Sequence, residues 1–186
     1  MKRIAIFASG SGSNAENIAR YFKDNTNIEI SLILSNKKDA YVLERAKLFK
    51  IPTVIFTKSE FFDSDNVINI LKEYKIDLIV LSGFLLLIHK NLIESFPNAI
   101  VNIHPALLPK YGGKGMYGMN VHKAVIENGD KKSGISIHFV NEQYDDGEII
   151  FQAHCDVKED DTPESLAERI HDLEYEHFPR VIEKLL

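Results

Sequence analysis

The 186-residue sequence has one cysteine and no long apolar run, and each absence excludes a class of protein. The lone Cys155 rules out an intramolecular disulfide and a cluster of thiolate ligands, and it is typical of a reducing compartment. The longest apolar stretch, 76–88, is interrupted by Asp77, Ser82 and Gly83 and falls short of the roughly 18 residues of a membrane span. We therefore expect a cytoplasmic protein with no membrane partner.

The sequence also has no excess of basic residues. Its 22 Lys and Arg are outnumbered by 27 Asp and Glu, which gives a formal net charge of -5. A surface that binds nucleic acid needs clustered Lys and Arg to contact phosphates. We therefore expect small-molecule partners and no nucleic acid, while the sequence leaves the oligomeric state, monomer or homodimer, open.

The pattern of apolar residues predicts an α/β protein. Apolar strands at 3–7, 28–35, 52–56 and 78–82 alternate with helices at 14–23, 40–50 and 60–74, the first of which Ser13 or Asn14 would cap. This pattern indicates a Rossmann-like, mostly parallel twisted sheet with helices on both faces. Strands at 134–140 and 149–157 and a helix at 163–186 follow, so the sheet is expected to be mixed in its C-terminal half.

No repeat or low-complexity linker divides the chain, and 45% of its residues are hydrophobic. The sequence therefore predicts a single domain over residues 1–186. Its architecture changes near residue 106, so that a Rossmann-like half at 1–105 precedes the remainder at 106–186.

One short stretch, 101–105, brings together side chains that can do chemistry. Asn102 and His104 are two residues apart on an expected strand, so they point to the same face, and Pro105 follows them. The strand then ends in a long Gly-rich loop, which is where a parallel sheet places its active site. The alternative is that the amide and imidazole only satisfy local backbone groups.

A Ser-Gly loop at 9–14 joins the first strand to the first helix. Glycines let the backbone approach an anion closely, and the free N–H groups of a helix start attract phosphate. The loop lacks the third glycine of a dinucleotide fingerprint, since Ala15 stands there, and it is not a Walker loop. It predicts a monophosphate site, with a merely tight turn as the alternative.

The loop at 141–147 is a third candidate. It lies between two strands, carries the adjacent acids Asp145 and Asp146, and closes with Gly147, which suits a positive φ. An ordinary solvated turn has the same composition. His138, on the strand before it, is expected to support the site rather than to transfer protons.

Together these segments resemble the phosphoribosylglycinamide formyltransferases, within the wider superfamily of 10-formyltetrahydrofolate-dependent formyltransferases. The resemblance covers nearly the whole chain. It rests on the runs at 9–14 and 102–111, on His138-Phe139-Val140, and on Asp145 seven residues after His138. The Asn, His and Asp triad is shared across the superfamily, and the phosphate loop points to this family within it.

The resemblance implies transfer of a formyl group from the cosubstrate 10-formyltetrahydrofolate to the amine of glycinamide ribonucleotide, in purine (IMP) biosynthesis. It implies that Asn102, His104 and Asp145 are catalytic. Asn102 and His104 would donate hydrogen bonds to the oxyanion that forms when the amine attacks the formyl carbon. Asp145 would favour the protonated form of His104 and orient a water that carries the proton. No metal is implied.

The same resemblance implies substrate-binding residues. Gly12, Ser13, Asn14 and Glu174 would bind the ribonucleotide, although a solvated helix carboxylate is the ordinary reading of Glu174. The folate site would take residues from 106–186 and from the segment before it: Leu85, Leu86, Leu87, Ile88, Val140, Asn141 and Tyr144. The apolar members of that set are also what a packed core would contain.

The chain departs from the family pattern at Leu86, where bacterial relatives often have an arginine, and at the Gly-rich insertion 113–119, expected to be a mobile lid or a plain surface loop. Asp146 replaces a common glycine.

Other functional classes also stay open: a formyltetrahydrofolate deformylase or another formyl-folate transferase, a non-catalytic phosphosugar-binding module, and a Rossmann oxidoreductase that binds a nicotinamide cofactor.

Overall fold

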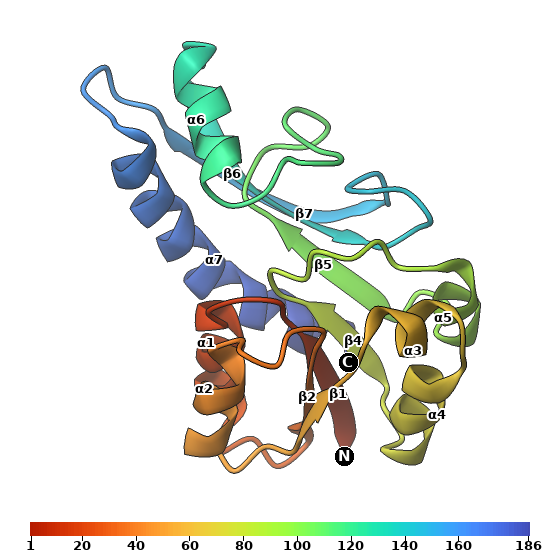
Figure 1. Cartoon of the computed structure of the whole chain (residues 1–186). Coiled ribbons are helices and arrows are strands. Elements are labelled where there is room, and N and C mark those ends of the chain that lie inside the picture. The colour runs from red at the N-terminus through yellow and green to blue at the C-terminus, as the bar shows by residue number, and fades with distance from the viewer.

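A seven-stranded sheet runs through the chain in the order β3-β2-β1-β4-β5-β6-β7 (Figure 1). The structure is a computed structural model that describes residues 1–186. Strands β1 to β5 are parallel, and β6 and β7 add antiparallel to β5. This confirms the predicted mostly parallel sheet with a mixed C-terminal half. The strands are β1 (Lys2–Phe7), β2 (Ile28–Ser35), β3 (Thr53–Ile55), β4 (Leu78–Leu81), β5 (Ile100–His104), β6 (Lys132–Phe139) and β7 (Ile149–Asp156).

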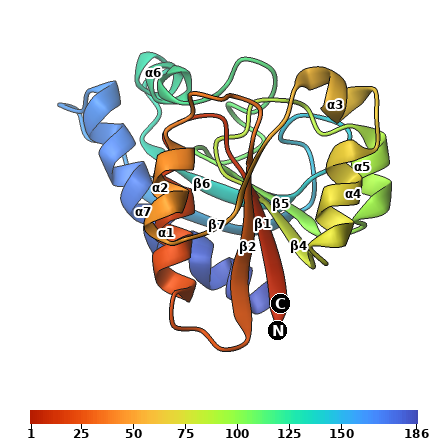
Figure 2. The same cartoon turned by 60° about the horizontal axis from the view of Figure 1, so that its bottom comes forward.

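Helices cover both faces of the sheet, as predicted. The view in Figure 2 separates one layer, formed by α1, α2 and α7, from a second layer formed by α3, α4 and α5. Helix α6 packs against α7 beyond the first layer. The helices are α1 (Ser13–Phe22), α2 (Val42–Leu48), α3 (Lys58–Phe62), α4 (Asn66–Glu73), α5 (Lys90–Ser95), α6 (Met119–Glu127) and α7 (Pro163–Leu185). No helix combines the length and the apolar character needed to cross a membrane.

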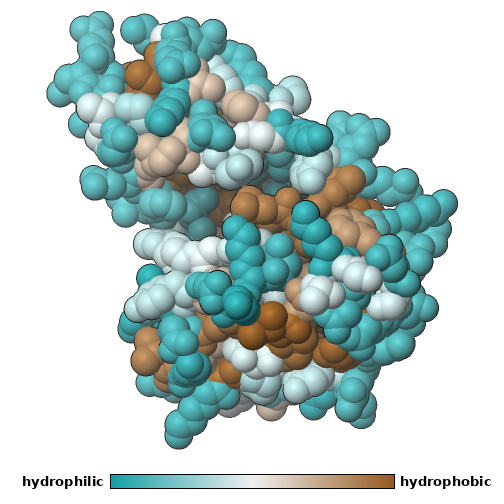
Figure 3. All heavy atoms as spheres, in the orientation of Figure 1, coloured by the Kyte–Doolittle hydropathy of each residue, from teal (hydrophilic) through white to brown (hydrophobic).

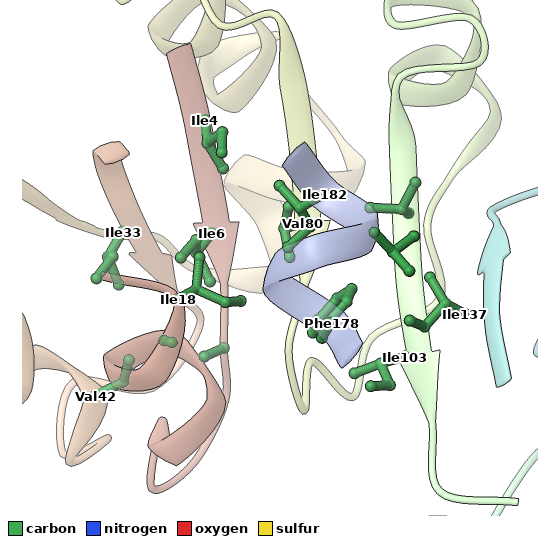
Figure 4. Close-up of a cluster of buried hydrophobic side chains, with 14 of the residues drawn as sticks. Ile4, Ile6, Ile18, Ile33, Val42, Val80, Ile103, Ile137, Phe178 and Ile182 are labelled. Carbon is green, nitrogen blue, oxygen red and sulfur yellow. The ribbon is translucent and has the colours of Figure 1, made fainter. Parts of the chain in front are cut away.

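The alternation of side chains along each strand creates two hydrophobic cores. Ile4 and Ile6 of β1 belong to the core under α1 and α7, whereas Ala5 and Phe7 belong to the core under α3 and α4. Figure 4 shows the first core, in which Phe178 and other α7 side chains lie over the strands. Full burial of one such large apolar side chain contributes about 1.5–3 kcal/mol. The two cores therefore pack against both faces of the sheet and fix the positions of its strand ends.

Local capping explains where several helices begin. Thr162 accepts a hydrogen bond from the backbone N–H of Ser165, and the Ser165 hydroxyl accepts one from the N–H of Thr162, so this reciprocal box starts α7. The predicted side-chain cap of α1 is wrong. The cap position is Gly12, with φ 71°, and it has no side-chain hydrogen bond. The left-handed turn at Gly12 leaves the side chains of Ser13 and Asn14 free for other contacts.

The predicted helix at 60–74 is two helices, α3 and α4. The hydroxyl of Ser64 donates to the carbonyl of Glu60 at 2.9 Å and accepts from the N–H of Asn66 at 3.3 Å. A serine that bonds the nearby backbone in this way replaces helical hydrogen bonds and separates the two segments. Helix α5 was not predicted at all, because its six residues are too few for a clear apolar period.

Candidate functional site

A cavity of about 700 Å³ opens at the carboxyl ends of β1, β4 and β5. That edge of a parallel sheet is where loops and helix starts converge on ligands. In the space-filling view most of the surface is hydrophilic, and a hollow separates the region of α6 above from that of α1 and α2 below (Figure 3). The cavity is lined by residues 10–14, 82–85, 102–105 and 113–119 and by six single residues: His122, Tyr144, Asp145, Ala167, His171 and Glu174.

His104 ends β5 and is held from two sides. Its Nε2 lies 2.7 Å from the carbonyl oxygen of Tyr111, and its Nδ1 lies 3.4 Å from Oδ1 of Asp145. Both partners are acceptors, so both contacts are satisfied when both ring nitrogens carry hydrogen, that is, in the imidazolium form. Because Tyr111 takes Nε2, only Nδ1 is available to the cavity.

Tyr111 is itself anchored. Its hydroxyl donates to Oδ2 of Asp130 at 3.0 Å, and Lys110 pairs with the same carboxylate oxygen at 3.1 Å. Burial and the bond to Asp130 raise the pKa of Tyr111, so it stays a neutral donor. The backbone of Tyr111 has φ 58°, which turns its carbonyl toward His104. This contact was not predicted, because no sequence pattern reports where a loop carbonyl points.

Asp145 is the point on which three nitrogen atoms converge. Asn102 Nδ2, His104 Nδ1 and His138 Nε2 lie 3.4, 3.4 and 3.8 Å from its Oδ1, and its Oδ2 accepts the N–H of Gly113 at 2.9 Å. The three contacts to Oδ1 are longer than the usual hydrogen bonds of 2.7–3.2 Å, whereas the one to Oδ2 is firm. The carboxylate is thus fixed through Oδ2, while Oδ1 has only long contacts with its two donors, Asn102 and His104.

The expected role of Gly147 is corrected by the backbone. Asp145, not Gly147, adopts the positive φ in this loop, at 53°. Gly147 is needed for a different reason: a Cβ at this position would overlap the carbonyl oxygen of Phe139. The glycine lets the loop pass close to β6, and Asp145 is thereby brought under His104.

Asn102 lies directly opposite His138 in the antiparallel pairing of β5 and β6. The Asn102 amide donates to His138 Nε2 at 3.1 Å, while His138 Nδ1 donates to the carbonyl of Phe139 at 2.7 Å. His138 is buried, and burial lowers its pKa, so a neutral ring that accepts from Asn102 is favoured. The supporting position predicted for His138 agrees with this geometry.

The Ser-Gly loop is braced by α2. The N–H of Val42 donates to the carbonyl of Gly10 at 3.1 Å, and Nε of Arg45 donates to the carbonyl of Ser11 at 2.8 Å. A Cβ at Gly12 would overlap Val42, so only glycine fits there. Two loop carbonyls are therefore turned toward α2 and away from the helix start, where N–H groups suit an anion.

Glu174 is buried and closes the opposite side of the cavity. Its Oε2 accepts from Asn14 Nδ2 at 2.8 Å and lies 2.9 Å from Nδ1 of His171. Hydrogen bonding to Glu174 raises the pKa of His171, which favours an imidazolium beside the carboxylate. The carboxylate is 5% exposed, so it is not the solvated helix carboxylate that the sequence alone would favour.

The predicted folate residues divide into two groups. Leu85 and Tyr144 line the cavity, but Leu86, Leu87, Ile88, Val140 and Asn141 do not. Ile88 is buried in the second core, and Leu86 and Val140 pack against that core. Asn141 instead bonds Asp146 and the backbone of Gln143. The folate role of these five residues stays a prediction.

Other cavity residues escaped the sequence. His122 and His171 line it from α6 and α7, and Met116 and Tyr117 line it from the Gly-rich segment 113–119. No pattern in the sequence assigns His122 or His171 to this site, and segment 113–119 was expected only to be a mobile lid or a plain surface loop. The structure shows no group of three or more His, Cys, Asp or Glu side chains arranged to hold a metal ion.

Comparison with known proteins adds a family to this geometry. A sequence model of the family described as "Formyl transferase" matches residues 2–182. The chain belongs to the formyl transferase family. The match spans the Ser-Gly loop, the Asn-x-His strand and the Asp145 loop, so the cavity described above lies entirely within the family region.

Several relatives of this chain are named phosphoribosylglycinamide formyltransferase. "Phosphoribosylglycinamide formyltransferase, chloroplastic" of Arabidopsis thaliana is 43% identical over 97% of this chain, and the enzyme named phosphoribosylglycinamide formyltransferase in Bacillus subtilis is 37% identical over 100% of this chain and 95% of its own. The chain spans 64% and 61% of the Arabidopsis thaliana and Vigna unguiculata relatives, less than two thirds of their length.

Solved structures agree with the fold. The crystal structure of phosphoribosylglycinamide formyltransferase from Bacillus halodurans superposes with a TM-score of 0.89 at 37% identity, covering 100% of this chain and 95% of that one. Glycinamide ribonucleotide transformylase 1 from Geobacillus kaustophilus gives a TM-score of 0.90 at 33% identity, covering 100% and 99%. This chain therefore has the same fold as these two proteins.

Proposed function

We propose that this protein transfers the formyl group of 10-formyltetrahydrofolate to the amine of N1-(5-phospho-D-ribosyl)glycinamide, a step of de novo purine (IMP) biosynthesis. The observation that carries the proposal is one cavity that joins Asn102, His104 and Asp145 to a Ser-Gly loop and to the buried Glu174. The names of relatives that are 36–43% identical to the chain support the same activity.

The ribonucleotide would lie between the Ser-Gly loop and Glu174. Gly12, Ser13 and Asn14 would bind its phosphate through backbone N–H groups and side-chain donors at the start of α1. Glu174 would accept a hydrogen bond from the amine of the glycinamide end. Asn14 supports this arrangement, because it bonds Glu174 and thus ties the phosphate end of the site to the amine end.

Attack of the amine on the formyl carbon gives a tetrahedral oxyanion, which needs hydrogen-bond donors already in place. Asn102 Nδ2 and His104 Nδ1 both lie 3.4 Å from Asp145 Oδ1. These long contacts leave a hydrogen on each nitrogen for the formyl oxygen. The short bonds of Asn102 to His138 and of His104 to Tyr111 would hold the two donors in position meanwhile.

Asp145 would have two tasks. Its charge would stabilise the imidazolium of His104, and Oδ1 would accept a proton from a water that shuttles it between the attacking amine and the leaving N10 of the folate. The N–H of Gly113 fixes Oδ2, so the carboxylate keeps its direction while Oδ1 exchanges partners. The Gly-rich segment 113–119 would therefore be coupled to Asp145 through this hydrogen bond.

The folate would enter beside Leu85 and Tyr144, the two predicted folate residues that line the cavity. Phe84 precedes Leu85 and packs edge-on against Phe7 and Phe61, with ring centroids 5.3 and 5.7 Å apart. This aromatic cluster anchors the segment 84–88 on the second core. The backbone groups of that segment would then be held for the pterin ring.

The proposal is tested by the absorbance change as a 10-formyl folate loses its formyl group, recorded with and without the ribonucleotide. Turnover only with the ribonucleotide is the expected result. Turnover without it would instead identify a deformylase, and no turnover with a ribonucleotide-dependent rise in melting temperature would identify a binding module. A rise in melting temperature with NAD or NADP would favour an oxidoreductase.

Further properties of the protein belong to the same proposal. We propose that residues 1–186 act as one domain, because one continuous sheet crosses the boundary near residue 106. The partners would be the two small molecules, without nucleic acid or membrane, and no metal would be required. The cytoplasm stays a prediction: the plant relatives are named chloroplastic and the Bacillus subtilis name gives no compartment.

A further inference from the structure

His122 is a buried polar residue that the proposed reaction scheme leaves without a task. It is the fourth residue of α6, it is 3% exposed, and it is one of the residues that line the cavity. Its Nδ1 is buried and has no hydrogen-bond partner in the protein. A buried polar atom without a partner destabilises a fold, so an imidazole kept at this cost indicates a task for its other nitrogen, Nε2, in the cavity.

The surroundings of His122 favour a neutral ring. Burial lowers its pKa, and the charges of His171 and His104 lower it further, against the opposing effect of Glu174. The groups that face it thus come from α7 and from the end of β5. At neutral pH the imidazole therefore has one nitrogen that accepts a hydrogen bond and one that donates.

We infer that His122 contacts the amine end of the phosphorylated substrate, with Nε2, the ring nitrogen that is not shut off from the cavity, accepting an N–H of the primary amine. The inference rests on the proposed function and adds a residue to it. Glu174 and His104, two of the groups that face it, would hold the amine and the formyl oxygen respectively. An amine whose N–H groups are bound by Glu174 and His122 keeps its lone pair free for the formyl carbon.

The contact explains why an imidazole stands at a position that packing alone would fill with an apolar residue. The neighbouring buried residues of α6, Val121 and Val125, are apolar, as expected for a helix face against a core. A phenylalanine or leucine in place of His122 would remove the unpaired nitrogen and keep most of the packing. Stability and activity are therefore expected to respond in opposite directions.

The test is His122→Phe, with His122→Leu as a smaller variant and His177→Phe as the matched control. His177 packs against Phe151, with ring centroids 5.0 Å apart, and does not line the cavity. We expect His122→Phe to melt at the wild-type temperature or above it. Its kcat/KM for the ribonucleotide should fall roughly 10- to 100-fold, while its KM for the folate stays within about twofold. His177→Phe should keep wild-type kinetics.

The results separate this inference from the proposed function. Folded His122→Phe or His122→Leu with wild-type kcat/KM for the ribonucleotide would overturn the inference while the wild-type protein remained a transferase. An equal loss for both substrates together with a lower melting temperature would also overturn it, because that is what a packing role produces. A wild-type protein that turns over folate without the ribonucleotide would remove the proposed function, and the inference with it.

Discussion

Replacing Asp145 by asparagine removes its charge and also turns Oδ1, the acceptor that faces Asn102 and His104, into an NH2 donor. Asparagine has the same shape, tolerates the positive φ of 53° at this position, and keeps an oxygen for the N–H of Gly113. What disappears is the negative charge 3.4 Å from Nδ1 of His104. Asp145→Asn therefore tests the charge of Asp145 together with the acceptor role of Oδ1, while the backbone and the contact with Gly113 are kept.

The magnitude follows from that distance. Two unit charges 3.4 Å apart interact by about 5 kcal/mol at an effective dielectric constant of roughly 20. The cost of burying both groups offsets part of this, since their side chains are only 4% and 12% exposed. A net loss of about 2.7–4 kcal/mol in the transition state corresponds to a kcat lower by roughly 100- to 1,000-fold.

The assay is the ribonucleotide-dependent absorbance change of the folate at saturating substrates, with a melting curve for each variant. Asp146→Asn is the matched control, because Asp146 is exposed and bonds only the Asn141 side chain, at 3.2 Å. We expect this control to keep kcat within about threefold of wild type. A folded Asp145→Asn protein with kcat within about tenfold of wild type would refute the electrostatic role.

Three other outcomes are expected. Ser13→Ala should raise the KM for the ribonucleotide about fivefold to tenfold and leave kcat nearly unchanged, which steady-state kinetics will show; an unchanged KM would remove the hydroxyl from the phosphate site. Gly147→Ala should lower the melting temperature by several degrees in a thermal scan, because its Cβ would overlap the Phe139 carbonyl; wild-type melting would mean that the loop shifts freely. Burial lowers the pKa of His122 and His138, so below the unfolded value near 6.5 the unfolded chain binds more protons at these positions, whereas the raised pKa of His171 acts in the opposite direction. The comparison between variants removes this opposing effect: from pH 7 to about 5 the melting temperature should fall less steeply, or rise more, in His122→Phe than in wild type. Equal slopes for the two proteins would contradict the assignment.

Much of the fold was predictable because short runs of neighbouring residues determine its strands and helices. Apolar runs such as 3–7 and 28–35 match β1 and β2 closely, since strands buried on both faces need unbroken hydrophobicity. The prediction of one helix at 60–74 was wrong because the hydroxyl of Ser64 competes with the helix backbone for hydrogen bonds. The six residues of α5 carried too little pattern to be seen.

The sequence by itself indicated several of the chemical groups that line the cavity, though not His122 or His171. A strand places Asn102 and His104 on one face, a glycine turn precedes the α1 start, and a resemblance marks Asp145 and Glu174. The first two features follow from neighbours in the chain, because strand periodicity and helix-start chemistry act over a few residues, whereas Asp145 and Glu174 were assigned by the resemblance alone.

Only the tertiary structure decided how these groups meet. The register of β5 on β6 sets Asn102 opposite His138, the fold joins Asn14 to Glu174 across 160 residues, and the Tyr111 carbonyl selects the His104 nitrogen that faces the cavity. Hydrogen bonds depend on distances of a few tenths of an ångström and on direction. Strand register and helix packing set both between residues far apart in sequence, and no local pattern encodes them.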